Sequence, residues 1–205
     1  MEEGANALSE HPVLPALQRQ SGKQGSRQSR YMRRDKHVPS LLFGKDEDGS
    51  EVNVPISVSE LDVNRLIRIR GRSIECTLLT IKMEDGKSVL ATPKGLQMCP
   101  INDRPLSLNF WVYRPGNRLN VPFKFINEEL STDLKRGSFL MRINKSMSIT
   151  CAPGVPPPPS IAVDLAGKVK GQVITLRDVQ LPAGVLRDKR TEEGLVIARV
   201  STNRG

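Results

Sequence analysis

Short apolar runs separated by turn residues dominate the chain from residue 38 to its end. Residues 51–58 (EVNVPISV) alternate polar and apolar positions, as a strand with one buried face does, and Pro55 indicates an edge position. The Asp-Gly pair at residues 85–86 separates two apolar runs and is a strong hairpin signal. Residues 106–113 (LSLNFWVY) predict a further strand. Together these features predict a β-rich unit that ends near residue 112.

One segment of this unit has a helical pattern instead. In residues 59–71 (SELDVNRLIRIRG), the apolar side chains of Val63 and Leu66 fall on one face of a helix. Ser59 can cap the amino end, and Gly71 can end the helix. The pattern therefore predicts a single helix here.

A second β-rich unit follows a turn at residues 114–117. Its strand-like runs recur about every ten residues, a spacing typical of a sandwich or a barrel. They occupy residues 119–126, 137–143, 147–153, 160–165, 172–182 and 194–200. The four prolines at residues 156–159 predict a stiff connector. The fold class is therefore mainly β with minor α, in two β-rich domains.

The formal net charge of +9 is distributed unevenly. Residues 1–16 contain three acidic residues and neither Lys nor Arg, and we predict a disordered leader there. Residues 17–40 contain seven basic residues and one acidic residue, and all seven basic residues lie in residues 17–37, here called the basic arm. The net charge is −1 over residues 41–110 and +7 over residues 111–205. A basic chain of this kind is typical of proteins that bind nucleic acid or an anionic surface.

The spacing of the cations in the basic arm suits a polyanion. If the arm is helical, Lys23, Arg27, Arg30 and Arg34 lie on one face. Such a face can neutralise several phosphates at once, and each arginine can do so with two hydrogen bonds. A solvated run of charge with no partner is the alternative.

Enzymatic chemistry has little support in this sequence. His11 and His37 are the only histidines, and neither has a neighbour that would complete an acid–base pair or a triad. No P-loop and no dinucleotide fingerprint is present. Cys76, Cys99 and Cys151 lack the CxxC spacing of a metal site, and their odd, scattered count indicates a reducing compartment. We therefore predict a protein that is not an enzyme and has no cofactor and no metal.

Targeting signals are also weak. No apolar run approaches the roughly 20 residues of a membrane-spanning helix. The opening residues MEEGANALSE are acidic and lack the apolar core of a secretory signal. The same acidity is unlike a plain mitochondrial presequence, which is rich in arginine and poor in acids.

The arm and the strand after it resemble a known family. The 5S rRNA-binding bacterial ribosomal protein family numbered twenty-five in the large subunit has a Gly-x-x-Ser-Arg-x-x-Arg arm, then Lys-x-(Ile/Val)-Pro and a strand that ends in Tyr-Gly. The stretch SRYMRRDKHVPSLLFG supplies Ser29, Arg30, Arg33, Lys36, Val38, Pro39, Phe43 and Gly44 at the matching positions. An alternative register places the family's Gly-Lys and Ser-Arg on residues 22–23 and 26–27.

A second motif strengthens the resemblance. The family pattern from Val-Leu to the closing Asp-Phe is matched by Val89, Leu90, Gln97, Pro100, Asp103, Arg104, Leu106, Leu108 and Phe110. Ser107 and Asn109 stand where the family has His and Asp, and Cys99 replaces a common His. The resemblance continues over about residues 19–201, and it is greatest to the two-domain branch called CTC, or general stress protein.

The resemblance implies both a fold and a set of partners. Residues 38–112 would form a β-barrel that binds 5S rRNA, and residues 113–205 a second β-rich domain. The protein would be a structural constituent of the large ribosomal subunit that stabilises its central protuberance. Its partners would be 5S rRNA, neighbouring large-subunit rRNA and ribosomal proteins, with no membrane and no small-molecule substrate.

The same resemblance, with the charge pattern, selects the residues expected to contact RNA. They are Lys23, Arg27, Ser29, Arg30, Arg33, Arg34, Lys36, Gln97, Arg104, Ser107 and Asn109. Ser and Asn side chains can hydrogen-bond phosphate, ribose or a base edge, although they cannot replace a His–Asp pair. Because the basic arm has no apolar face, we expect it to be unstructured until it binds RNA.

Two other functions and two locations stay open at this point. The chain could be a stress-related RNA-binding protein that acts off the ribosome. It could also be an anticodon-binding module like the β-barrels of a glutamine-type tRNA synthetase, although it has no room for a catalytic domain. The acidic leader and the departures at Ser107 and Asn109 favour a mitochondrial ribosome, in the matrix. The bacterial cytoplasm is the alternative.

Overall fold

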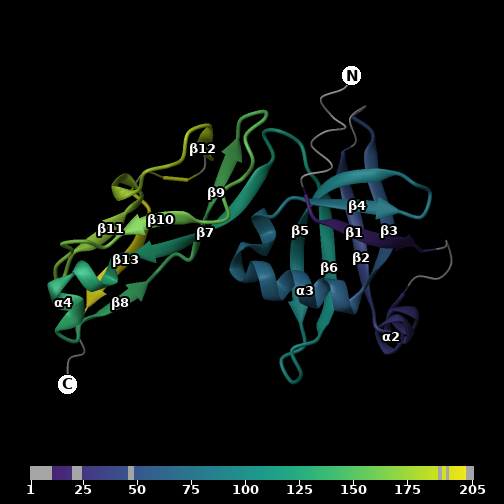
Figure 1. Ribbon diagram of the computed structural model, residues 1–205, viewed down its shortest axis with the longest axis horizontal. Coiled ribbons are helices and arrows are strands. Elements are labelled where there is room, and N and C mark those ends of the chain that lie inside the picture. The colour runs from purple at the N-terminus through teal and green to yellow at the C-terminus, as the bar shows by residue number, and fades with distance from the viewer. Residues whose placement is uncertain (1–10, 20–24, 46–48, 189–190, 193, 202–205) are drawn as a thin grey trace. The chain divides into compact units, whose positions relative to one another are not determined.

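Two compact β-rich units make up the chain (Figure 1). The structure, a computed structural model, describes residues 11–19, 25–45, 49–188, 191–192 and 194–201. The first unit is Met1–Arg114 and the second is Pro115–Gly205. The predicted fold class, mainly β with minor α in two domains, is confirmed. Within the described residues, no helix is long and apolar enough to cross a membrane.

Six strands of the first unit close into a barrel in the order β1-β3-β2-β6-β5-β4. They are β1 (Val13–Gln18), β2 (His37–Lys45), β3 (Glu51–Ser59), β4 (Leu79–Met83), β5 (Ser88–Met98) and β6 (Pro105–Val112). The pairs β2–β6 and β1–β4 are parallel, and the other neighbours are antiparallel. Because the sheet closes on itself, it presents no free edge.

The barrel is filled by every second side chain of its strands, as their alternating patterns predict. Leu42, Ile56, Ile81, Leu108 and Phe110 are fully buried in this core.

The predicted helix is α3 (Glu60–Arg70), followed by a 3₁₀ helix η1 (Gly71–Cys76). Val63 and Leu66 are its buried residues, and Gly71 ends it at a φ of 50°, a left-handed conformation that favours glycine. The predicted helix and its end are therefore confirmed.

The Asp-Gly hairpin is confirmed between β4 and β5, where Gly86 has a φ of 78°. The prediction of an edge position for Pro55 is wrong, because β3 lies between β1 and β2. The carbonyl of Pro55 accepts a hydrogen bond of 2.9 Å from the Arg19 amide. The nitrogen of Pro55, which has no hydrogen to donate, therefore faces the β1 side of β3 as well. Pro55 lies just beyond Gln18–Ile56, the last register pair of β1 and β3.

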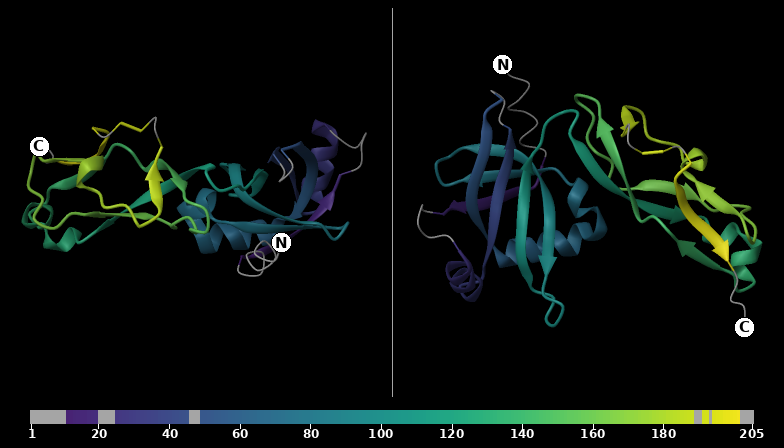
Figure 2. Two further views of the ribbon diagram at one scale, coloured as in Figure 1. Left: turned by 90° about the horizontal axis from the view of Figure 1, so that it is seen from above. Right: turned by 180° about the vertical axis from the view of Figure 1, so that it is seen from behind.

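Strand β1 shows that the predicted disordered leader is wrong for residues 13–16. Leu14 and Ala16 are only 5% and 2% exposed and belong to the barrel core. The strand pairs with both β3 and β4, and it thereby closes the barrel (Figure 2). Of the rest of the predicted leader, residues 1–10 lie outside the described residues, and residues 11 and 12 lead into β1.

The second unit contains two separate sheets, in the orders β10-β7-β9-β12 and β11-β13-β8. Their strands are β7 (Arg118–Ile126), β8 (Phe139–Arg142), β9 (Ser146–Cys151), β10 (Ile161–Asp164), β11 (Val173–Thr175), β12 (Val185–Arg187) and β13 (Val196–Ser201). The short helices are η2 (Glu128–Leu130), α4 (Thr132–Lys135) and η3 (Leu176–Asp178). The predicted strand over residues 172–182 is strand only in β11. It then turns into η3, where Thr175 and Asp178 form a capping box.

Deleting the inward side chain of β1 should destabilise the first unit. We expect Leu14→Ala to lower the free energy of unfolding by about 2–5 kcal/mol, because it leaves a cavity in the barrel core. Val13→Ala is the matched control, since Val13 is 57% exposed and should change stability by about 0.5 kcal/mol or less. Urea denaturation of the two variants measures both values. Equal effects would show that β1 does not close the barrel in solution.

Candidate nucleic-acid interface

The helix α2 (Ser26–Arg34) lies within the basic arm and precedes β2 (Figure 1). It carries the predicted residues Arg27, Ser29, Arg30, Arg33 and Arg34. None of its side chains is fully buried. The expectation that the arm is unstructured until it binds RNA stays a prediction, and the helix is the conformation that these residues adopt in the structure. Lys23 lies outside the described residues.

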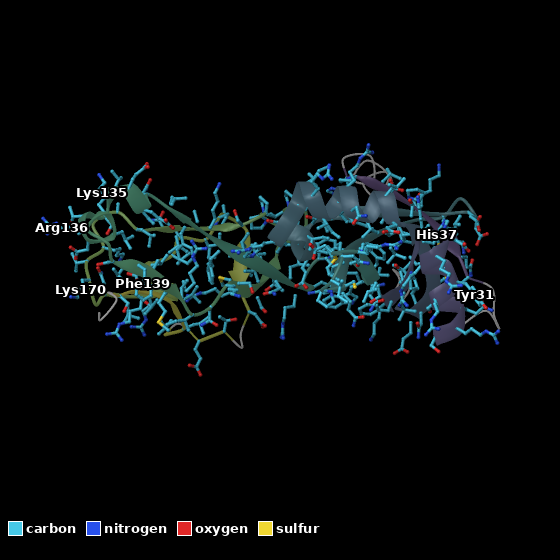
Figure 3. All side chains as sticks on the ribbon, turned by 90° about the horizontal axis from the view of Figure 1, so that it is seen from below. Tyr31, His37, Lys135, Arg136, Phe139 and Lys170 are labelled. Atoms are coloured by element: carbon cyan, nitrogen blue, oxygen red, sulfur yellow. The ribbon has the colours of Figure 1, made fainter. Side chains whose placement is uncertain are left out.

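The exposed face of α2 is cationic. Arg27, Arg30 and Arg34 are exposed and share that face by their helical spacing. The side chain of Tyr31 (Figure 3) is 44% exposed. The Arg34 guanidinium lies 6.0 Å from its ring centroid. Ser29 differs, because its hydroxyl donates to the Gly25 carbonyl at 3.0 Å within the helix.

Lys36 makes the sharp connection from α2 to β2. Its φ of 58° is left-handed, which is uncommon for a residue with a side chain. Its carbonyl accepts a hydrogen bond of 2.9 Å from the amide of Glu60, the first residue of α3. The Lys36 side chain is exposed and stays available to an anion.

Two of the predicted arginines donate hydrogen bonds to other elements of the first unit. Arg33 Nε donates to the Leu106 carbonyl at 2.9 Å, and so joins α2 to β6. Arg104 Nε and Nη2 donate to Glu60 Oε1 and Oε2 at 2.8 and 2.7 Å. Arg104 Nη2 also donates to the Arg33 carbonyl at 3.3 Å. These contacts bring α2, α3 and the start of β6 together.

The outward face of β5 and β6 carries the remaining predicted residues. Because Leu108 and Phe110 point into the barrel, Ser107 and Asn109 point outward. The Ser107 hydroxyl donates to Oε1 of Gln97 at 3.0 Å, and these two residues are register partners. This polar pair lies beside α2, since Arg33 binds the carbonyl of the residue that precedes Ser107.

A β-bulge positions Gln97 on this face. The register of β5 against β6 shifts between Lys94 and Gln97, where Gly95 has a φ of 63°. Lys94 and Gln97 are three residues apart and would face opposite sides of a regular strand. The extra residue of the bulge shifts the alternation by one position, so that Leu96 packs against the core and Gln97 faces outward, as Lys94 does. Sequence spacing alone could not show this.

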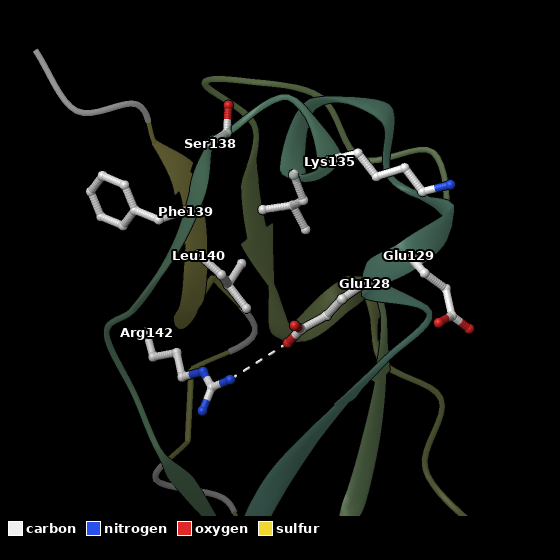
Figure 4. Close-up of a pocket in the computed structure, with 8 residues that line it drawn as sticks. Glu128, Glu129, Lys135, Ser138, Phe139, Leu140 and Arg142 are labelled. Atoms are coloured by element: carbon white, nitrogen blue, oxygen red, sulfur yellow. Dashed lines mark hydrogen bonds and ion pairs between the residues drawn. The ribbon is translucent and has the colours of Figure 1, made fainter.

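The second unit contains a pocket of about 480 Å³ that holds none of the predicted residues (Figure 4). Glu128 and Glu129 line it together with Lys135 and Arg142, and Arg142 Nη2 lies 3.5 Å from Glu128 Oε1. Its two carboxylates are balanced by two cations, so the charges of the pocket wall favour neither an anionic nor a cationic ligand. Within the described residues, no group of three or more His, Cys, Asp or Glu side chains could hold a metal ion.

The Glu60–Arg104 ion pair should make stability depend on pH. Hydrogen bonds from Arg104 hold the pKa of Glu60 below its ordinary value of 4.5. A lowered pKa in the folded state stabilises the protein above pH 4.5, and this stabilisation is lost as the pH falls through the folded pKa. We therefore expect wild type to exceed Glu60→Gln in stability at neutral pH, and the difference to shrink below pH 4.5. Urea denaturation across that range measures it, and a constant difference would contradict the expectation.

Comparison with known proteins divides the chain as the structure does. Residues 14–110 match the Ribosomal L25p family, and residues 117–204 match the C-terminal domain of ribosomal protein TL5. The large ribosomal subunit protein bL25 of Ruegeria sp. (strain TM1040) is 31% identical over 184 residues, which cover 88% of this chain and 83% of that protein. The bL25 of Mesorhizobium japonicum is 31% identical over 163 residues, which cover 78% and 73% of the two chains. For the bL25 of Novosphingobium aromaticivorans the identity is 29% over 195 residues, covering 94% and 90%. The chain therefore belongs to the Ribosomal L25p family, in its form with a TL5-type C-terminal domain.

Proposed function

We propose that this protein is a structural constituent of the large ribosomal subunit and binds 5S rRNA through its first unit. The observation that carries the proposal is the attachment of the arginine-rich helix α2 to β6, where Arg33 donates to the Leu106 carbonyl next to Ser107, which pairs with Gln97 on the outward face. Relatives over most of the chain are named large ribosomal subunit protein bL25. This family is structural and not enzymatic, in agreement with the sequence analysis.

Each part of the surface has its own role in RNA binding. Arg27, Arg30, Arg34 and Lys36 neutralise phosphates, because all four are exposed and form no ion pair among the described residues. Contacts to phosphate position the protein and carry no sequence information.

The polar face of β5 and β6 supplies the selective contacts. A-form RNA presents base edges and 2′-hydroxyls in a wide, shallow minor groove, which suits short polar side chains on a β surface. Gln97 keeps both amide N–H donors, because its contact with Ser107 uses only its oxygen. Asn109 extends the same face one register pair further, opposite Lys94.

The second unit docks on neighbouring rRNA and ribosomal proteins. Residues 111–205, which contain this unit, have a net charge of +7, and this charge favours RNA as part of that environment.

The comparisons bear on the location and on the rival functions. The three relatives are bacterial, so they support a ribosome in the bacterial cytoplasm more than the mitochondrial ribosome expected from the leader.

The matches to ribosomal protein families over both units also favour a ribosomal constituent over an anticodon-binding module. Co-sedimentation with large subunits in a sucrose gradient separates this function from that of a stress-related RNA-binding protein off the ribosome.

The exposed arginines of α2 should account for much of the salt dependence of RNA binding. Replacing Arg27, Arg30 and Arg34 together by Gln should flatten the slope of log affinity against log salt by about two to three units. The matched control replaces Arg65, Arg68 and Arg72, three basic residues of the same unit, and changes net charge equally. Fluorescence anisotropy with cognate 5S rRNA measures both slopes. Equal slopes for the two variants would mean that α2 is a bystander.

The Gln97 side chain should contribute to selectivity. We expect Gln97→Ala to weaken binding to cognate 5S rRNA by about 1 kcal/mol, the net value of one hydrogen bond. Binding to an unrelated RNA duplex of equal length should change little, because phosphate contacts dominate there. An equal loss on both RNAs would restrict Gln97 to a non-specific or folding role. Circular dichroism of the variant checks that the barrel is intact.

A further inference from the structure

Arg104 connects the ends of two helices. Its guanidinium lies against the carbonyl end of α2, where it donates to the Arg33 oxygen, and against the carboxylate of Glu60 at the amide end of α3. A cation at a helix carboxyl end and an anion at an amino end both interact favourably with the helix dipoles. The Arg33 carbonyl also accepts from the Lys36 amide at 3.3 Å, so Arg104 adds a second hydrogen bond there and links the two helix ends.

The position of α2 depends on few other contacts. No side chain of the helix is fully buried, and its apolar residue Met32 is only half-buried, so it has less of the apolar packing that normally fixes a surface helix. Its described polar anchors are the hydrogen bonds from Arg33 to the Leu106 carbonyl and from Arg104 to the Arg33 carbonyl, and just beyond its end the Glu60 amide donates to the Lys36 carbonyl. Glu60 in turn fixes Arg104, and its side chain is 13% exposed whereas that of Arg104 is 47% exposed.

Because the Glu60 side chain is negatively charged, it is an unexpected part of a surface that binds RNA, which is a polyanion. A carboxylate near phosphate is repulsive, and its removal should strengthen binding if only long-range electrostatics matters. Glu60 is ionised at neutral pH, because the ordinary pKa of its carboxyl is 4.5 and hydrogen bonds from Arg104 lower that pKa further. The same carboxylate holds the guanidinium that orients α2, so its two effects on RNA affinity have opposite signs.

We propose that Glu60 is a positioning residue for RNA binding, which acts through Arg104 to hold α2 so that its arginines face the RNA together with Gln97 and Ser107. This inference rests on the proposed function. It assigns Arg104 to the orientation of α2 and not to a phosphate contact. An acidic residue thereby promotes the binding of a polyanion.

The decisive experiment compares two acidic residues in the first turn of α3. Glu60→Gln removes the carboxylate that binds Arg104, whereas Asp62→Asn removes the same charge two residues away. Asp62 forms no ion pair in the part of the chain that the structure describes. We expect Glu60→Gln to weaken binding of the full-length protein to 5S rRNA by about threefold to tenfold, the scale of a lost hydrogen bond. Asp62→Asn should leave the affinity unchanged or raise it.

Variants of Arg104 test the route of the effect. Arg104→Lys keeps the charge but loses the planar fork that reaches both Glu60 and the Arg33 carbonyl, so it should weaken binding as Glu60→Gln does. The double variant Glu60→Gln/Arg104→Lys should bind no more weakly than Arg104→Lys alone. Additive losses, or an Arg104→Lys protein with wild-type affinity, would assign Arg104 to phosphate and overturn the proposal.

Amide hydrogen exchange of the free protein tests the positioning without RNA. Exchange in residues 27–34 should be faster in Glu60→Gln than in Asp62→Asn, while amides of β2 and β3 stay equally protected in both. If wild type fails to bind 5S rRNA but α2 loosens in Glu60→Gln, the proposed function fails and the positioning role stands. If Glu60→Gln binds RNA as tightly as wild type, or α2 exchanges alike in both variants, the positioning role fails.

Discussion

Closure of the barrel by β1 is the constraint on which the first unit depends. Without β1, both β3 and β4 would present an open edge, and the buried side chains of Leu14 and Ala16 would be missing from the core. A closed barrel fixes the register of each strand against two neighbours. The outward residues of β5 and β6 therefore occupy defined positions on a rigid surface, as selective contacts require.

On that surface, two devices place polar groups where the alternation of a strand would not. The bulge at Gly95 turns Gln97 outward opposite Ser107. The contacts of Arg33 and Arg104 attach α2 to the barrel without burying any of its side chains. Such polar attachment keeps the face with Arg27, Arg30 and Arg34 free for anions.

Local signals in the sequence predict part of this structure. The features that sequence analysis missed depend on contacts between residues that lie far apart along the chain. The Asp85–Gly86 hairpin and α3 are visible because each is specified by neighbouring residues. Strand β1 is six residues long and gains its burial only from β3 and β4, which lie far along the chain. The Glu60–Arg104 pair spans 44 residues and cannot be read from spacing. The outward position of Ser107 can be predicted from the alternation along β6. Gln97 is selected only through the family resemblance, because the bulge that turns it outward cannot be recognised from sequence spacing.

Ser107 and Asn109, which stand where the family has His and Asp, change the chemistry of the polar face but keep groups there that can form hydrogen bonds. A His–Asp pair would carry a titratable group whose charge changes near neutral pH. Here Ser107 and Gln97 form a neutral pair, in which the hydroxyl donates and the amide N–H groups of Gln97 are not used. Neutral hydrogen bonds are weaker than charge-assisted ones, so in the proposed RNA complex selectivity would rest on geometry more than on charge. The bulge that holds Gln97 opposite Ser107 matters correspondingly more in this chain.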